Sequence, residues 1–352
     1  MLTRDFIEDS LYNPSYGYFS KHATIFNPGD PFDFNSIQSD KDFHELLGQR
    51  YMDFEDKIDD ENPDDNRQLW HTPTELFRPY YGEAIARYLV ANYKLTVFPY
   101  DDLIIYEMGA GNGTMMRNIM DYIRDFEPEV YQRTKYRIIE ISSSLAGLQE
   151  LTKKLGGHAG HVEILNRSVF DWNEYVSAPC FFLALEVFDN FAHDEIRYNP
   201  YTEGPLQGGV LIDNDGEFFE YYEQPEFIPT RLMQFFDVLQ KYFPAHKLVA
   251  SDFNKLPSPI KGINAPIVQT RYQRKNVTVT TPFVHQGYFD IFFPSDFTVM
   301  EDIYRAITGK LTKVSTHRDF LERWAWIEET TTANGENPML EWYKNAMVLT
   351  TI

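Results

Sequence analysis

Residues 103–114 read Leu103-Ile104-Ile105-Tyr106-Glu107-Met108-Gly109-Ala110-Gly111-Asn112-Gly113-Thr114. This apolar run, typical of a buried strand, ends at a carboxylate and then breaks into three glycines at alternate positions. The next residues, 115–123, carry apolar side chains at helical spacing. A strand, a glycine turn and a helix start together predict a nucleotide-type site, because glycine lets the backbone approach a ligand and free amides attract polar groups.

The spacing of the glycines separates two classes of nucleotide site. A dinucleotide fingerprint has glycines at the first, third and sixth positions, whereas here Thr114 stands at the sixth. With an acidic residue two places before the first glycine, the pattern resembles the cofactor loop of class I methyltransferases that use S-adenosylmethionine. A glycine-rich turn that holds no ligand is the plainer alternative. The resemblance implies that Glu107 shapes the methionine end of the cofactor and that the loop contacts it at Gly109, Ala110, Gly111 and Gly113.

Two later segments favour the cofactor interpretation. Residues 136–141 form a second predicted strand that ends in Glu140, whose carboxylate suits the two donor hydroxyls of a ribose. Further on, Asp171 could accept a hydrogen bond from the exocyclic amine of adenine, with Phe170 or Trp172 covering the ring. The alternatives are a solvated strand end for Glu140 and an ordinary loop position for Asp171.

A second group of acidic residues follows the apolar strand predicted over residues 180–185. Glu186 and Asp189 come directly after it, and ligands of an open α/β sheet bind at the carboxyl ends of its strands. Two carboxylates there could hold and orient a guanidinium, which is planar and protonated in water. We therefore take Glu186 and Asp189 as candidate catalytic residues. The alternative is that Glu186 caps the following helix and that Asp189 lies on the surface.

Composition excludes several classes of protein. The 352 residues carry a net charge of −21, which argues against broad binding of nucleic acid phosphates but suits a basic protein partner. The single cysteine, Cys180, excludes an internal disulfide and a multi-cysteine metal site. No apolar run reaches the roughly 18 residues of a membrane span, and the histidines show no metal-binding spacing. We expect neither a metal nor a membrane span.

The chain divides into two predicted parts. Residues 1–100 read as helical and irregular, with an acidic insertion over about 30–67 that we expect to be mobile, and a helix that begins at Thr72 and Pro73. Residues 101–352 predict an α/β domain with a mostly parallel sheet covered on both faces. Strands predicted over 277–281 and 288–293 should join that sheet or fold over its pocket.

Five segments spread over most of the chain share one family pattern: Leu11–Phe19, Thr72–Glu75, Glu107–Thr114, Ile139–Leu145 and Glu186–Asn190. Together they resemble the MidA-like family, whose members have a class I, Rossmann-like methyltransferase fold. Residues 11–19 are the most specific of them, because generic methyltransferases lack their combination of aromatic and turn residues. The family includes a mitochondrial protein-arginine methyltransferase needed for assembly of respiratory complex I, so the resemblance implies the mitochondrial matrix, although no presequence is visible.

The sequence departs from the family pattern chiefly in its substrate half. Asn112 replaces an arginine of the glycine loop, and Asn190-Phe191-Ala192 replaces "ALP" after Asp189. The late "DYG" motif reads Asp252-Phe253-Asn254. Such departures are expected of a divergent member with a changed substrate.

The sequence thus predicts an S-adenosylmethionine-dependent methyltransferase that acts on a protein side chain, with arginine of a mitochondrial protein favoured by the resemblance. One alternative is a non-catalytic assembly or scaffold factor that keeps the methyltransferase fold and docks a basic partner through its acidic surface. A small-molecule methyltransferase is a further alternative. The sequence gives no indication of the oligomeric state.

Overall fold

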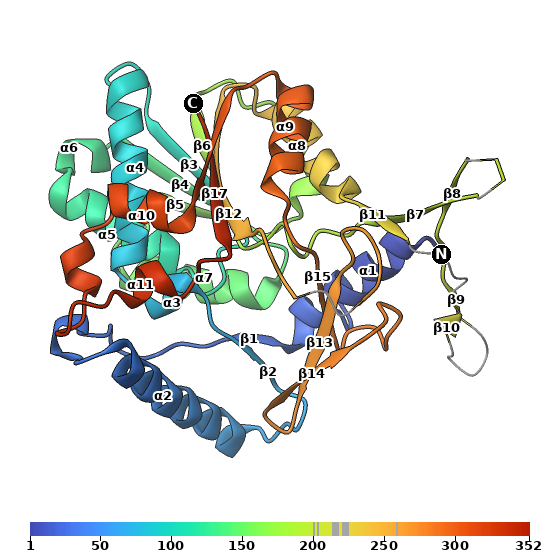
Figure 1. Cartoon of the computed structure of the whole chain (residues 1–352). Coiled ribbons are helices and arrows are strands. Elements are labelled where there is room, and N and C mark those ends of the chain that lie inside the picture. The colour runs from blue at the N-terminus through green and yellow to red at the C-terminus, as the bar shows by residue number, and fades with distance from the viewer. Residues whose placement is uncertain (200, 203, 213–217, 220–224, 258–259) are drawn as a thin grey trace.

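A computed structural model describes residues 1–199, 201–202, 204–212, 218–219, 225–257 and 260–352 (Figure 1). Within these ranges, a central sheet of seven strands has the order β16-β17-β12-β6-β3-β4-β5. Strands β12, β6, β3, β4 and β5 pair in parallel, and β17 runs antiparallel to both of its neighbours. This confirms the predicted mostly parallel sheet. The strands are β3 (Leu103–Met108), β4 (Thr134–Ile139), β5 (Val162–Leu165), β6 (Cys180–Leu185), β12 (His246–Phe253), β16 (Thr312–Thr316) and β17 (Ala346–Thr351).

Helices cover both faces of this sheet because its strands are apolar on both sides. In β3, Leu103 and Ile105 belong to one core, whereas Ile104 and Tyr106 belong to another, as the alternation of side chains along a strand requires. Helices α4 (Tyr80–Thr96), α5 (Thr114–Phe126) and α10 (His317–Trp324) pack into the first core, and α8 (Thr230–Tyr242) and α9 (Phe297–Thr308) into the second (Figure 1). The glycine loop between β3 and α5 is therefore held between two packed elements.

Three further helices belong to this part of the chain. Helix α7 (Ser143–Leu155) connects β4 to β5, and α6 (Pro128–Tyr131) and α11 (Pro338–Glu341) are single turns. The predicted helix that begins at Thr72 is interrupted, because Pro79 has no amide to donate and its ring blocks the preceding turn. It forms α3 (Pro73–Leu76) and α4. None of the helices in the described ranges is long and apolar enough to cross a membrane.

Several small sheets lie beside the central one. The strands predicted over 277–281 and 288–293 form β14 (Lys275–Val279) and β15 (Asp290–Phe292), which flank β13 (Ile267–Tyr272) in a separate antiparallel sheet. Helix α1 (Thr3–Tyr12) packs against this sheet in a third apolar core. The other short strands are β1 (Ala23–Ile25), β2 (Gln68–Trp70), β7 (Asp194–Tyr198), β8 (Pro205–Gln207), β9 (Leu211–Ile212), β10 (Phe218–Phe219) and β11 (Glu226–Ile228).

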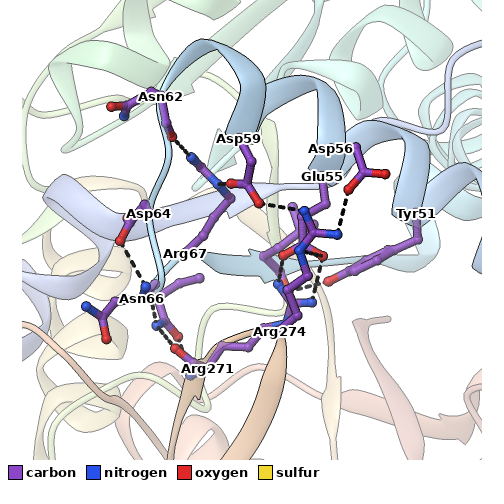
Figure 2. Close-up of polar contacts among 12 residues, drawn as sticks. Tyr51, Glu55, Asp56, Asp59, Asn62, Asp64, Asn66, Arg67, Arg271 and Arg274 are labelled. Atoms are coloured by element: carbon purple, nitrogen blue, oxygen red, sulfur yellow. Dashed lines mark hydrogen bonds and ion pairs between the residues drawn. The ribbon is translucent and has the colours of Figure 1, made fainter.

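The acidic insertion is a helix, which corrects our expectation of a mobile segment. Helix α2 (Asp40–Glu61) has 22 residues and begins at Ser39, whose hydroxyl accepts a hydrogen bond from the amide of Asp42. Six charged residues, which we call the α2 clamp, hold this helix in place (Figure 2). They are Glu55, Asp56, Asp59, Arg67, Arg271 and Arg274. Two of the arginines belong to the β13–β14 hairpin, and the third lies just before β2.

The geometry of the α2 clamp explains why an acidic helix is stable here. Arg271 donates to both oxygens of the buried Glu55, with Nη2 at 3.0 Å from Oε2. Arg274 lies 2.6 Å from a carboxylate oxygen of Asp56 and 2.7 Å from one of Asp59. Three carboxylates that would repel one another along one helix are thus neutralised by arginines from a distant hairpin.

Candidate active site

One cavity of about 1000 Å³ opens at the carboxyl ends of β3, β4 and β6. This is where an open α/β sheet binds its ligands. One side of the cavity is formed by the ends of those strands and the loops that follow them. The opposite side is formed by α1, α2, β2 and the β13–β15 sheet.

The glycine loop lines this cavity in a conformation that only glycine adopts easily. Gly109 and Gly111 have φ angles of +70° and +52°. A Cβ added at Gly109 would lie 2.8 Å from Val187 Cγ1, and one at Gly111 would lie 2.7 Å from Ile25 Cδ1. The loop therefore leaves backbone without a side chain at Gly109 and Gly111, and both residues and Ala110 between them line the cavity.

Gly113 has a different place from the other two glycines. It does not line the cavity, but it begins α5 with a φ of +77°, and Thr114 and Met115 of that helix face the cavity. Gly113 thus turns the chain so that the start of α5 faces the cavity. Helix starts favour polar and negatively charged ligand groups.

Glu75, which belongs to α3, supports the glycine loop through its side chain. The sequence pattern did not identify it as a site residue. Its Oε1 accepts hydrogen bonds from Asn112 Nδ2 at 3.0 Å and Thr114 Oγ1 at 2.7 Å, and Arg78 lies 3.1 Å from Oε2. The carboxylate is 2% exposed. The signal available was the capping pattern from Thr72 to Glu75. The hydroxyl of Thr72 does accept from the amide of Glu75, but the carboxylate reaches the glycine loop instead.

Two of the three acidic residues predicted for the cofactor, Glu107 and Glu140, line the cavity. Glu107 is buried and accepts from Tyr136 Oη at 2.8 Å, and burial raises its pKa to about 7. Glu140 accepts from the amide of Ser142 and from Gln149 Nε2, each at 2.9 Å, and burial raises its pKa. Gln149 also donates to the carbonyl of Gly111 at 2.9 Å, so it joins the second strand end to the glycine loop.

The segment predicted to contact adenine is only partly at the cavity. Phe170 lines it, with the Arg231 guanidinium 4.6 Å from the centre of its ring. Asp171 is exposed and does not line the cavity, because the short helical turn at Val169–Asp171 directs it to solvent. Trp172 is buried in the core beneath α8 and donates to the carbonyl of Glu174 at 2.7 Å. The structure therefore does not bring Asp171 or Trp172 to the site.

Glu186 lines the cavity directly after β6, in a strained backbone conformation. Its φ is +55°, which is rare for a residue with a side chain. Its amide donates to the carbonyl of Ser251 at 2.8 Å, which fixes this turn. Burial, with a further contribution from the charge of Asp252, raises the pKa of Glu186 to about 8. No helix follows directly, so the capping alternative is wrong.

Asp189 is buried rather than on the surface. It is 7% exposed, and no group in the described ranges makes a hydrogen bond to its Oδ1. Burial raises its pKa well above the usual range, and the charges of Asp252, Asp290 and Glu186 raise it further. A buried acceptor without a partner is costly. Asp189 is therefore suited to a ligand that brings its own donors.

Two further carboxylates stand beside it that the sequence reasoning did not select. Asp252 Oδ2 accepts from the amides of Phe188 at 2.8 Å and Asp189 at 3.1 Å, and burial raises its pKa to about 6. Asp290 lines the cavity from β15 and accepts from Asn190 Nδ2 at 2.9 Å, and burial raises its pKa to about 7. This acidic end of the cavity would neutralise a cation.

The arrangement fits S-adenosylmethionine. The glycine loop lines the cavity with backbone in a positive-φ conformation at Gly109 and Gly111, which lets a ligand approach the main chain. Glu140 keeps acceptor capacity for ribose hydroxyls, since each carboxylate oxygen takes more than one hydrogen bond. Phe170 offers an aromatic face at the far side. In the described part of the chain, no cluster of three histidine, cysteine or acidic side chains is placed to hold a metal ion.

Comparisons with known proteins agree with this geometry. A sequence model for a family described as S-adenosyl-L-methionine-dependent methyltransferases matches residues 84–316. A relative from Schizosaccharomyces pombe, named a mitochondrial protein arginine methyltransferase NDUFAF7 homolog, is 26% identical over 381 residues, covering 91% of this chain and 79% of the relative. A Saccharomyces cerevisiae relative with the same name is 23% identical over 310 residues, covering 76% of this chain and 77% of the relative.

A solved structure shows the same fold. The crystal structure of a Burkholderia thailandensis protein bound to S-adenosyl-homocysteine superposes with a TM-score of 0.65 at 14% identity, covering 100% of this chain and 88% of that one. A native crystal structure from the same organism gives a TM-score of 0.63 at 13% identity, covering 100% and 87%. The predicted fold class is confirmed.

Proposed function

This chain belongs to that family of S-adenosyl-L-methionine-dependent methyltransferases, and on this basis we propose that it methylates a guanidinium nitrogen of arginine in a protein. We further propose that the protein substrate is mitochondrial and takes part in assembly of respiratory complex I. The first proposal is supported by the names of the two yeast relatives, which are protein arginine methyltransferases described as mitochondrial. The second rests on the resemblance to the MidA-like family.

The observation that carries the proposal is the acidic end of the cavity. Asp189 keeps a buried oxygen without a partner in the described residues, and Glu186 faces the same cavity three residues before it. Both carboxyls have raised pKa values, because they are buried near other acids. A guanidinium offers five donors in one plane and a positive charge. It would therefore satisfy the free acceptor and relieve the repulsion among the carboxylates.

When bound, S-adenosylmethionine supplies a methyl group carried on a positively charged sulfur. The protein would have to hold this cofactor, exclude water and orient the acceptor. The glycine loop and Glu140 would hold the cofactor, and the enclosing side chains exclude water. Glu186 and Asp189 would orient the guanidinium, which accounts for most of what a displacement on carbon needs from the protein. The guanidinium nitrogen that takes the methyl group would lose a proton, and Glu186 would accept it, because a bound guanidinium stabilises the ionised form of a carboxyl that burial otherwise keeps protonated.

The test is direct product analysis. The purified protein is incubated with methyl-labelled S-adenosylmethionine and a pool of arginine-containing peptides, and methylarginines are measured by mass spectrometry after hydrolysis. We expect methylarginine from the wild type and at least a hundredfold less from the Glu186→Gln, Asp189→Asn double variant. That variant must still bind S-adenosyl-homocysteine in calorimetry, so that the loss is assigned to the acceptor end.

Two outcomes would contradict the proposal. The first is a wild-type protein that binds S-adenosyl-homocysteine but methylates no arginine in the pool or in mitochondrial extract. The second is full rescue of a deletion phenotype by the folded double variant, which would favour a scaffold function for this fold.

A further inference from the structure

A glycine stands in the middle of α2 without any visible need for it in the protein itself. Gly48 lies inside a 22-residue helix, where glycine is less stable than alanine. A Cβ added there would meet no atom within 4 Å, so close packing does not require glycine. Nor does the backbone, because Gly48 is not among the residues with positive φ. An unexplained glycine can mark a place where a ligand approaches closely.

The empty space over Gly48 belongs to the cavity of the candidate active site. Four residues of α2 line that cavity, namely His44, Leu47, Gly48 and Tyr51. Their spacing places them on one face of the helix. We call this face the α2 wall. It lies on the side opposite the strand ends that carry the glycine loop.

The β13 strand connects the α2 wall to the acidic end of the cavity. Gln269 on β13 is paired in register with Asp290 on β15. Arg271, two residues further along the same face of β13, has its guanidinium 5.5 Å from the centre of the Tyr51 ring. Gln269, Arg271 and Asp290 all line the cavity. The α2 clamp then holds the wall to this hairpin, as Figure 2 shows.

A second connection runs along the other side of the cavity. The ring of His44 lies 5.6 Å from that of Trp342. Trp342 and the neighbouring Tyr343 line the same cavity as Glu186. The α2 wall is therefore continuous with the acceptor end on two sides.

We propose that the α2 wall receives the polypeptide backbone of the substrate segment that carries the target arginine, with Gly48 leaving the space for it. The inference rests on the proposed function. A polypeptide is the expected occupant because the α2 wall is continuous with the acidic end of the cavity. If the guanidinium of the substrate lies against Glu186, Asp189 and Asp290, its main chain must lie further out in the same cavity. The volume of about 1000 Å³ is at the upper end for a site that binds one small molecule, which leaves room beside the cofactor.

The test uses two alanine substitutions that are matched in the free protein. Gly48→Ala fills the α2 wall. Gly147→Ala is the control, because Gly147 lies inside α7, is exposed, does not line the cavity, and would also meet no atom within 4 Å. Two acceptors are compared: agmatine, which is a guanidinium without a polypeptide, and a pool of blocked heptapeptides with a central arginine.

Both substitutions should raise the melting temperature, since each improves an exposed helix position. Only Gly48→Ala should raise the ratio of the KM for the peptide pool to the KM for agmatine, by about tenfold, as expected when a methyl group meets a bound backbone. The affinity for S-adenosyl-homocysteine should stay the same. A purely structural glycine would give none of this selectivity.

Each contrary result has a separate meaning. If the wild type methylates neither acceptor, the proposed function fails and this inference fails with it. If it methylates both and Gly48→Ala behaves like Gly147→Ala, the proposed function stands and the α2 wall does not bind substrate. Weaker binding of S-adenosyl-homocysteine by Gly48→Ala would assign the wall to the cofactor, and a lower melting temperature would show that Gly48 has a packing role. Either result overturns the inference.

Discussion

The replacement Glu186→Gln should stabilise the protein while it removes the proposed activity. In the folded protein the pKa of Glu186 is raised from 4.5 to about 8, first by burial and then by the charge of Asp252. Between these two values the folded state holds a proton that the unfolded state releases. Stability therefore falls as the pH rises through this window. Glutamine keeps the size of the side chain and removes the titration.

The expected gain depends on pH in a way that packing alone would not produce. At about 1.36 kcal/mol for each pKa unit, the free energy of unfolding should rise by about 1 kcal/mol at pH 5 and by at most about 3 kcal/mol at pH 7. Urea unfolding of the wild type and of Glu186→Gln at both pH values measures the difference. The same gain at both pH values, or a loss at pH 7, would refute the assignment of Glu186 as a carboxyl held protonated by its site.

Four other substitutions test the cofactor loop and the α2 clamp. Gly111→Ala should weaken the binding of S-adenosyl-homocysteine at least about tenfold in calorimetry. An alanine is strained at a φ of +52° and its Cβ would overlap Ile25, so the loop would have to shift. Unchanged affinity would refute the role of this loop in binding the cofactor. Glu75→Gln should lower the free energy of unfolding, measured in urea, by about 1–3 kcal/mol, since a buried charged network is broken. It should also weaken the binding of S-adenosyl-homocysteine. Normal binding would show that the glycine loop does not need the support of Glu75. Arg271→Met should lower the free energy of unfolding by about 3 kcal/mol, because the buried Glu55 loses both hydrogen bonds from Arg271 and keeps only Arg274 Nε at 3.8 Å. Arg274→Met should lower it much less, and equal losses would contradict this account of the clamp.

The cofactor half of the site could be predicted because its signals are local. A buried strand followed at once by glycines locates the loop at Gly109 and Gly111, and parallel strands bring their carboxyl ends to one edge, which is why Glu140 and Glu186 reach the same cavity. Asp171 does not line the cavity, because a helical turn of three residues decides which side chain of that segment faces it. Periodicity over so few residues carries no such information.

The acceptor half of the site and helix α2 could not be predicted, because they are formed by contacts between distant parts of the chain. Helix α2 is stabilised by arginines that follow it by some two hundred residues, so its acidic run alone indicated a mobile segment. Asp290 comes from a strand outside the central sheet, and only the folded structure places it near Asp189. Such pairings are set by tertiary structure, which local patterns do not encode.

The position of β17 has a consequence for how the protein is made. This strand, Ala346–Thr351, lies inside the central sheet between β12 and β16 rather than at its edge. During synthesis residues 346–351 leave the ribosome long after the glycine loop. Until β17 is made, β12 and β16 lack the strand that pairs with both of them. Until then β12 exposes one row of unpaired backbone groups, a template for association with other chains. We therefore expect the nascent protein to need protection from chaperones until the last strand of this sheet has been inserted.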